Sequence, residues 1–124
     1  MFNLDLKDKV ILITGGSDGL GYASAELLSS EGAKVIICGR RGDYLNEKAK
    51  TISENTNNNV LAIQADVSKA EDCKRLVEET ISKFKKIDIL VNNAGASAAA
   101  LFEDVSDKNW EDDINLKLMS TIRM

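Results

Sequence analysis

Residues 9–21 read KVILITGGSDGLG, and the rest of the fold can be worked out from them. The run Val10–Ile13 is aliphatic and mostly β-branched, which predicts a short strand buried on both faces. Four glycines then crowd into residues 15–21, at the start of a helical pattern. A strand, a glycine turn and a helix aim free backbone N–H groups, and the positive end of the helix dipole, at an anion. The segment therefore predicts a phosphate-binding loop rather than a plain connection.

At three of these positions we expect glycine to be required, each time for a different steric reason. A side chain at Gly15 would obstruct the tight turn, and one at Gly19 would hold a pyrophosphate away from the backbone. At Gly21 a Cβ would push the helix off the strand. The face of this helix that we expect to be buried consists of Leu20, Ala23, Leu27 and Leu28.

The composition is that of an ordinary globular protein, with 44% hydrophobic and 29% charged residues. The length predicts one domain over residues 1–124. A formal net charge of −4 argues against a nucleic-acid partner or an anionic membrane surface. No apolar run approaches the ~20 residues that a membrane helix needs.

Two residue types limit the chemistry and the compartment. Cys38 and Cys73 are the only cysteines, and both sit in apolar patterns, which predicts buried free thiols in a reducing compartment, the cytoplasm. The chain has no histidine. Serine–histidine hydrolysis and most zinc chemistry are therefore excluded within this chain, and we expect no metal site.

The alternation of strand and helix continues to the end of the chain. Further buried strands are predicted at Lys34–Cys38, Val60–Gln64 and Ile87–Val91. Apolar strands that alternate with helices predict an α/β fold, a Rossmann-like doubly wound parallel sheet with helices on both faces. Right-handed crossovers then predict the strand order 3-2-1-4.

Local signals predict where the helices begin and end. Gly32 stands where the first helix needs a left-handed residue at its C-terminus. Ser68 and Glu71 are expected to form a capping box for the third helix. A last helix is predicted from about Ser106, with Glu111–Asp113 in its first turn rather than in a metal site. The expected apolar faces are Tyr44, Leu45, Ala49 and Ile52 on the second helix, Cys73, Leu76, Val77, Thr80, Ile81 and Phe84 on the third, and Trp110, Ile114, Leu118 and Ile122 on the last.

The glycine spacing from Thr14 to Gly21 is T-G-x-x-x-G-x-G, and it resembles that of the short-chain dehydrogenase/reductase family. The resemblance implies a nicotinamide dinucleotide cofactor. Asp66-Val67 is similar to the family's D-V pattern, in which the aspartate hydrogen-bonds the adenine; alone, such an aspartate is more often a cap or turn residue. Residues 92–95, Asn-Asn-Ala-Gly, resemble the family's N-N-A-G. Small residues there let the backbone approach the ribose, and the amide side chains can brace neighbouring strand ends.

The residues after the second strand bear on the choice between NADP and NAD. An acidic residue there would suit the ribose 2′-hydroxyl of NAD, whereas Arg40 suits the 2′-phosphate of NADP, with Arg41 or Ser17 assisting. Two observations leave NAD open: the arginines can simply be solvated, and Asp18 is acidic where NADP-preferring relatives often carry a basic residue. The candidate cofactor-binding residues are Gly15, Ser17, Asp18, Gly19, Leu20, Gly21, Arg40, Arg41, Asp66, Val67, Asn93, Ala94 and Gly95.

Asn115 is the one catalytic candidate, because it matches the asparagine of the family's catalytic tetrad. Its implied role is indirect, through a water site that links the catalytic lysine to solvent; an exposed helix asparagine is the alternative. The family's serine and Tyr-x-x-x-Lys would follow later, so the chain resembles the N-terminal half of the pattern, truncated after the fourth βα unit. Tyr44-x-x-x-Lys48 has the right spacing, but we expect it on the adenosine side, away from the nicotinamide.

The resemblance implies an NADP(H)-dependent oxidoreductase that acts on a small carbonyl or alcohol, represented by its cofactor-binding half and inactive as this chain alone. A non-catalytic dinucleotide-binding or self-associating module is the alternative. A flavodoxin-like FMN domain or a receiver domain would need a different first loop. Since the Ile87–Val91 strand would be a bare sheet edge, we expect a homo-oligomer through that edge or through the Trp110–Ile122 helix face.

Overall fold

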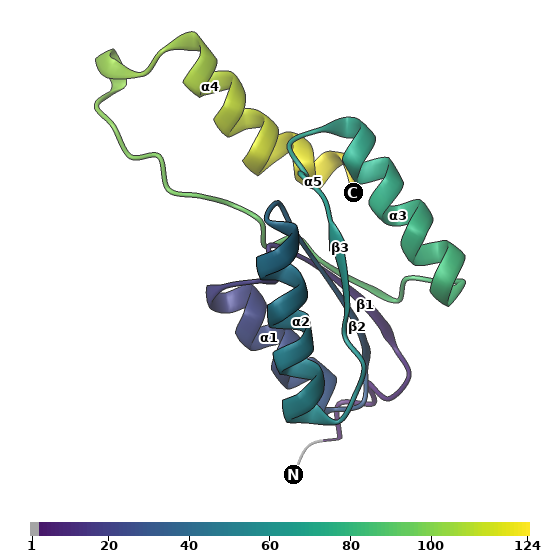
Figure 1. The fold of residues 1–124 in the computed structure, drawn as a ribbon. Coiled ribbons are helices and arrows are strands. Elements are labelled where there is room, and N and C mark those ends of the chain that lie inside the picture. The colour runs from purple at the N-terminus through teal and green to yellow at the C-terminus, as the bar shows by residue number, and fades with distance from the viewer. Residues whose placement is uncertain (1–2) are drawn as a thin grey trace.

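The computed structural model describes residues 3–124 and contains a four-stranded sheet in the order β3-β2-β1-β4 (Figure 1). This is the predicted strand order, and all three strand pairings are parallel, also as predicted. The strands are β1 (Val10–Thr14), β2 (Lys34–Gly39), β3 (Leu61–Gln64) and β4 (Ile89–Val91). The helices are α1 (Gly19–Ser30), α2 (Gly42–Thr56), α3 (Ala70–Phe84), α4 (Asp107–Ile114) and α5 (Ser120–Arg123), with a 3-10 turn at Phe102–Asp104 and a π-helical turn at Asn115–Met119.

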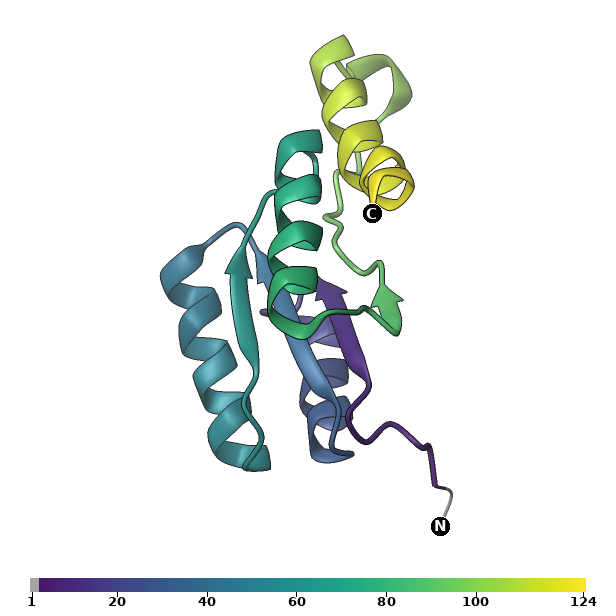
Figure 2. The same ribbon diagram turned by 90° about the vertical axis from the view of Figure 1, so that its right-hand side faces the viewer.

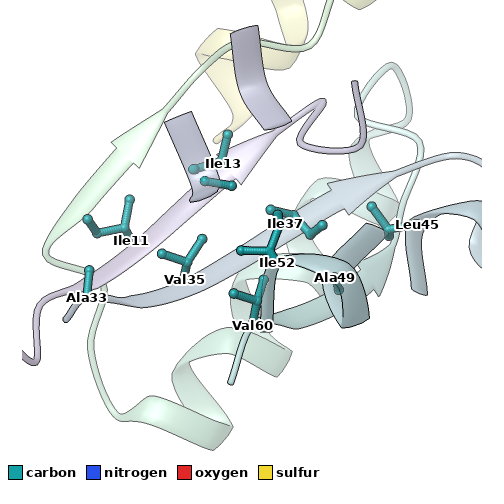
Figure 3. Close-up of a cluster of buried hydrophobic side chains, with 10 residues drawn as sticks. Ile11, Ile13, Ala33, Val35, Ile37, Leu45, Ala49, Ile52 and Val60 are labelled. Carbon is teal, nitrogen blue, oxygen red and sulfur yellow. The ribbon is translucent and has the colours of Figure 1, made fainter. Parts of the chain in front are cut away.

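Alternate side chains of the central strands serve two separate cores. Ile11, Ile13 and Val35 pack under α1 and α2 on one face of the sheet (Figure 3). Leu12 and Ile36 point to the opposite face, which α3 covers (Figure 2). Because successive strand residues point to opposite sides, a strand buried on both faces must be apolar throughout, as β1 is.

Both cysteines belong to the core on the α3 side. Cys38 lies at the end of β2 and Cys73 in the first turn of α3, and both are buried free thiols, as predicted. Burial raises the pKa of the Cys38 thiol to about 11, so the thiol stays protonated near neutral pH.

The prediction for the buried face of α1 is wrong. Leu20 is 82% exposed and Leu27 61% exposed, Ala23 is exposed too, and only Leu28 packs partly against the core. The residues of α1 that are buried are Gly21, Ala25 and Ser29. Small residues let this helix lie close to β1, so its packing face is marked by small size rather than by large apolar side chains.

The apolar faces of the later helices are confirmed only in part. The residues that are buried as expected are Leu45, Ala49 and Ile52 on α2 and Cys73, Leu76 and Thr80 on α3. Ile81, which was expected on the same face of α3, is 40% exposed. The predicted stripe of Trp110, Ile114, Leu118 and Ile122, which runs from α4 through the π-helical turn to α5, is exposed.

The predicted end of α1 is confirmed, whereas the predicted start of α3 is wrong. Gly32 has a φ of +85° and donates its N–H to the Ser29 carbonyl. Helix α3 begins at Ala70, its N-cap residue is Lys69, and within residues 3–124 no side chain caps its N-terminus. The Ser68 hydroxyl donates instead to Asp66 Oδ1 at 2.6 Å, which makes a local turn before the helix.

Helix α4 begins as predicted but carries its acidic residues elsewhere. The Ser106 hydroxyl accepts the N–H of Asn109 at 3.2 Å and caps the helix. The run Glu111–Asp113 lies beyond the first turn, contrary to the prediction, and its aspartates pair along the helix: Asp112 with Lys108 and Asp113 with Lys117, each at 2.7 Å. Among residues 3–124, no helix has the length and apolar character required to cross a membrane.

Candidate functional site

The carboxyl ends of the strands surround a pocket of about 380 Å³. Parallel α/β sheets bind ligands in this position, where the strands end and the helices begin. Every residue proposed from the sequence for cofactor binding lines the pocket except Gly21. Sequence reasoning missed four lining residues, Cys38, Gly39, Ala65 and Leu116; the first three end or directly follow β2 and β3, and that position was the available signal.

The glycine loop packs tightly against the strand ends. Gly15 has a φ of +65°, and a Cβ there would lie 2.9 Å from the Ala94 Cα. A Cβ at Gly21 would overlap the Gly15 carbonyl oxygen. Gly21 therefore acts behind the pocket, by letting α1 approach the loop. In the part of the chain that the structure describes, a Cβ at Gly19 would have no atom within 4 Å, so this position faces open space.

Asn93 braces the glycine loop against β4. Its Nδ2 donates to the Thr14 carbonyl at 3.2 Å and to the Gly15 carbonyl at 3.0 Å. Thr14 Oγ1 accepts the N–H groups of Asn93 and Ala94, each at 3.0 Å. The expectation that the amide braces neighbouring strand ends is confirmed. Thr14 is 2% exposed and was not a candidate site residue, although it opens the glycine motif.

Asp66 is positioned by a turn at the end of β3. Its Oδ1 accepts hydrogen bonds from the N–H of Ser68 at 3.0 Å and from the Ser68 hydroxyl. The Asp66 N–H donates to Asp72 Oδ2 at 2.7 Å. This hydrogen bond, with a smaller contribution from Arg75, holds the pKa of Asp72 below its ordinary value. Oδ2 of Asp66 accepts no hydrogen bond from residues 3–124 and can accept one from a ligand.

The two arginines after β2 are not equivalent. Arg41 donates to Asp18 Oδ2 at 3.0 Å, and its guanidinium carbon lies 4.1 Å from the centre of the Tyr44 ring. Arg40 also lines the pocket and is exposed, and within residues 3–124 its side chain forms no ion pair. Of the two guanidinium groups, Arg40 is thus the one available to an anion.

Asn115 lies outside the pocket lining, where α4 gives way to the π-helical turn. It is half-buried, and its neighbour Leu116 lines the pocket. π-Helical turns often occur at functional sites. Tyr44 and Lys48 both lie on α2, the helix that follows β2, and the Tyr44 hydroxyl donates to Asp18 at the start of α1.

Comparison with known proteins identifies similar chains. The sequence model for short chain dehydrogenases matches residues 9–124. An 11-beta-hydroxysteroid dehydrogenase-like protein of Arabidopsis thaliana is 44% identical over 110 residues, which are 86% of this chain and 36% of that protein.

Two solved structures are similar in fold as well as in sequence. L-Sorbose reductase from Gluconobacter frateurii, complexed with NADPH and L-sorbose, is 34% identical with a TM-score of 0.94, over 98% of this chain and 46% of that one. An NADH-dependent reductase complexed with NAD is 32% identical with a TM-score of 0.89, over 100% of this chain and 51% of that one. The chain thus spans about a third to a half of the length of these relatives.

Proposed function

The chain belongs to the short-chain dehydrogenase/reductase family, and from this we propose that it is the cofactor-binding half of an NADP(H)-dependent oxidoreductase. The reaction would be hydride transfer between the cofactor and a small carbonyl or alcohol. The observation that carries the proposal is the pocket, which three separate motifs line: the glycine loop, Asp66-Val67 and residues 93–95. NADPH in the sorbose reductase and NAD in the NADH-dependent reductase support the class of cofactor.

The residues around the pocket fit a dinucleotide along its length. The first N–H groups of α1 and the open space at Gly19 suit the diphosphate. Asp66 Oδ2 can accept a hydrogen bond from the adenine amino group, and the backbone of Ala94 and Gly95 can lie against the nicotinamide ribose. When bound, the nicotinamide supplies or accepts the hydride. The chain's own contribution here is binding and orientation.

We assign the 2′-phosphate of NADP to Arg40. A guanidinium without a carboxylate partner can bind a phosphate bidentately, and among the described residues Arg40 meets that condition whereas Arg41 does not. Asp18 favours NAD by its charge alone, but its carboxylate is paired with Arg41. The arrangement therefore favours NADP over NAD.

Titration with NADP⁺ and NAD⁺ tests this proposal. The chain should bind NADP⁺ more tightly, and Arg40→Ala should weaken NADP⁺ binding by about tenfold or more while NAD⁺ binding changes little, because a charged hydrogen-bond pair to phosphate is lost. Lys50→Ala is the control, since it removes a positive charge from an exposed ion pair on α2. If Arg40→Ala lowers the affinity for NADP⁺ and NAD⁺ equally, the 2′-phosphate assignment is refuted. If the unaltered chain binds neither cofactor, the proposed function is refuted.

Asn115 is our proposed catalytic-site residue, and the chain alone is proposed to be inactive. The sequence of this chain has no Tyr-x-x-x-Lys after Asn115, and the Tyr44 hydroxyl donates a hydrogen bond to Asp18. NADPH oxidation with a carbonyl substrate should therefore be at background.

Two free buried thiols fit a reducing compartment, and we place the protein in the cytoplasm.

A self-associating module is the second candidate, and exposed apolar surface favours it. Ile89 on the edge strand β4 is 36% exposed, and Leu118 and Ile122 are more than half exposed on the last helical segment. An open strand edge and an apolar helix face both invite pairing with another chain. We propose a homo-oligomer through one of them. A stable monomer in sedimentation equilibrium would refute it.

A further inference from the structure

Asp18 occupies the N-cap position of α1 without capping it. Its backbone is extended, with φ −144° and ψ 165°, which suits an N-cap residue. Aspartate there ordinarily accepts the N–H of the second or third helical residue, here Leu20 or Gly21. Within residues 3–124 the Asp18 side chain makes no such bond. Instead Oδ2 accepts a hydrogen bond from Arg41, and Oδ1 accepts one from the Tyr44 hydroxyl.

Both partners of Asp18 come from the start of α2, and they support one another. Arg41 is the N-cap residue of α2 and Tyr44 lies in its first turn. The Arg41 guanidinium stacks over the Tyr44 ring at 4.1 Å, so each partner restricts the other. Lys48 Nζ lies 5.2 Å from the centre of the same ring. We call Asp18, Arg41 and Tyr44 the Asp18 latch.

The latch bears directly on anion binding at α1. A carboxylate that capped the helix would use the N–H groups that a diphosphate needs, and would place a negative charge where the diphosphate sits. We propose that Arg41 and Tyr44 hold the Asp18 carboxylate away from the N-terminus of α1, so that a released Asp18 competes internally with the dinucleotide. This inference rests on the proposed dinucleotide function, and it gives Asp18, Arg41 and Tyr44 a positioning role toward the diphosphate.

An ordinary surface ion pair makes a different prediction. Such pairs contribute little to stability, and breaking one would leave dinucleotide affinity unchanged. In the latch, breaking the pair weakens binding, and the effect requires the carboxylate. Because Arg41 is close to the expected 2′-phosphate position, the appropriate probe is NAD⁺, which lacks that phosphate.

The first experiment compares NAD⁺ dissociation constants by calorimetry in two backgrounds. Arg41→Ala/Tyr44→Phe should raise the Kd about fivefold, the factor expected from one capping interaction that binding must displace. In an Asp18→Ala background the same two changes should leave the Kd unaltered. Tyr22→Phe is the matched control, since Tyr22 also lies beneath Lys48 but gives no hydroxyl to Asp18. If Arg41→Ala/Tyr44→Phe leaves the Kd unchanged while Asp18 is present, or raises it equally with Asp18 present and in the Asp18→Ala background, the proposal is overturned.

The second experiment needs no ligand and separates the latch from the proposed function. In the ligand-free Arg41→Ala/Tyr44→Phe protein, a released Asp18 should cap α1 and slow the amide hydrogen exchange of Leu20 or Gly21 several-fold. Asp18→Ala should remove that slowing, and unchanged exchange overturns the latch. If the unaltered chain binds neither NAD⁺ nor NADP⁺, the proposed function fails, and the exchange result alone decides whether the latch exists.

Discussion

Replacing Thr14 by valine tests the hydrogen bonds that connect the start of the glycine loop to the segment after β4. Valine keeps the size of threonine but removes the hydroxyl, which accepts the N–H groups of Asn93 and Ala94 at 3.0 Å each. An unsatisfied buried donor costs about 1–3 kcal/mol, and because these donors are only partly buried the lower end applies to each. Thr14→Val should therefore reduce the free energy of unfolding by about 2 kcal/mol.

Urea unfolding measures this loss, and Thr14→Ser is the control. With a denaturant slope of about 2 kcal/mol/M, the valine variant should unfold at a midpoint about 1 M lower. Serine keeps the hydroxyl and loses one buried methyl, at a cost of about 1 kcal/mol. If packing were the cause, serine would be the more damaging change. A serine variant as unstable as the valine variant, or more so, would refute the hydrogen-bond account.

Three further outcomes follow from packing and from the pKa directions. Gly21→Ala should destabilise the fold by about 2 kcal/mol in urea unfolding, because its Cβ would overlap the Gly15 carbonyl and move α1; an unchanged midpoint would contradict the close approach. The pKa of Asp72 is lowered by the Asp66 N–H, so its stabilisation is complete above pH ~4 and is lost as the pH falls through the folded-state pKa. The Tm difference between the wild type and Asp72→Asn should therefore shrink on acidification and disappear once the pH is below the folded-state pKa of Asp72; a pH-independent gap would contradict this. Cys38, with its pKa raised to about 11 by burial, should react with iodoacetamide at pH 8 far more slowly in the native than in the unfolded protein, as mass spectrometry can measure.

The strand order could be predicted because it depends on patterns that are local and strong. Each strand is a short apolar run, and the spacing between runs leaves room for a helix and a right-handed crossover. The face of α1 could not be predicted in the same way. Hydrophobic periodicity predicts that Leu20 and Leu27 are buried, whereas the close packing of α1 on β1 buries the small residues Gly21 and Ala25 instead. Size complementarity between two elements is invisible in the periodicity of either one.

The site shows the same division between local and long-range information. The glycine loop, Asp66 and the segment around Asn93 were recognisable because each motif lies within a few neighbouring residues. The contact of Asp18 with Arg41 joins residues that are 23 positions apart, and only the fold brings them together. The failed capping box at Ser68 has a local cause, because the Ser68 hydroxyl donates to the Asp66 carboxylate only two residues before it.

The net charge of −4 does not argue against an anionic cofactor, because screening limits each charge to its neighbourhood. At physiological ionic strength the screening length is about 8 Å, so most carboxylates of the chain do not act on the pocket. Within that range lie the N-terminus of α1, the guanidinium of Arg40, the carboxylate of Asp66, and Asp18, whose charge is paired with Arg41. The two arginines of the pocket thus differ: Arg41 neutralises a carboxylate of the protein, and Arg40 is the one that we propose binds a phosphate of the cofactor. Local pairing of this kind allows an acidic protein to bind a polyanion, and the loss of Arg41 should weaken binding of the diphosphate because it releases the Asp18 carboxylate.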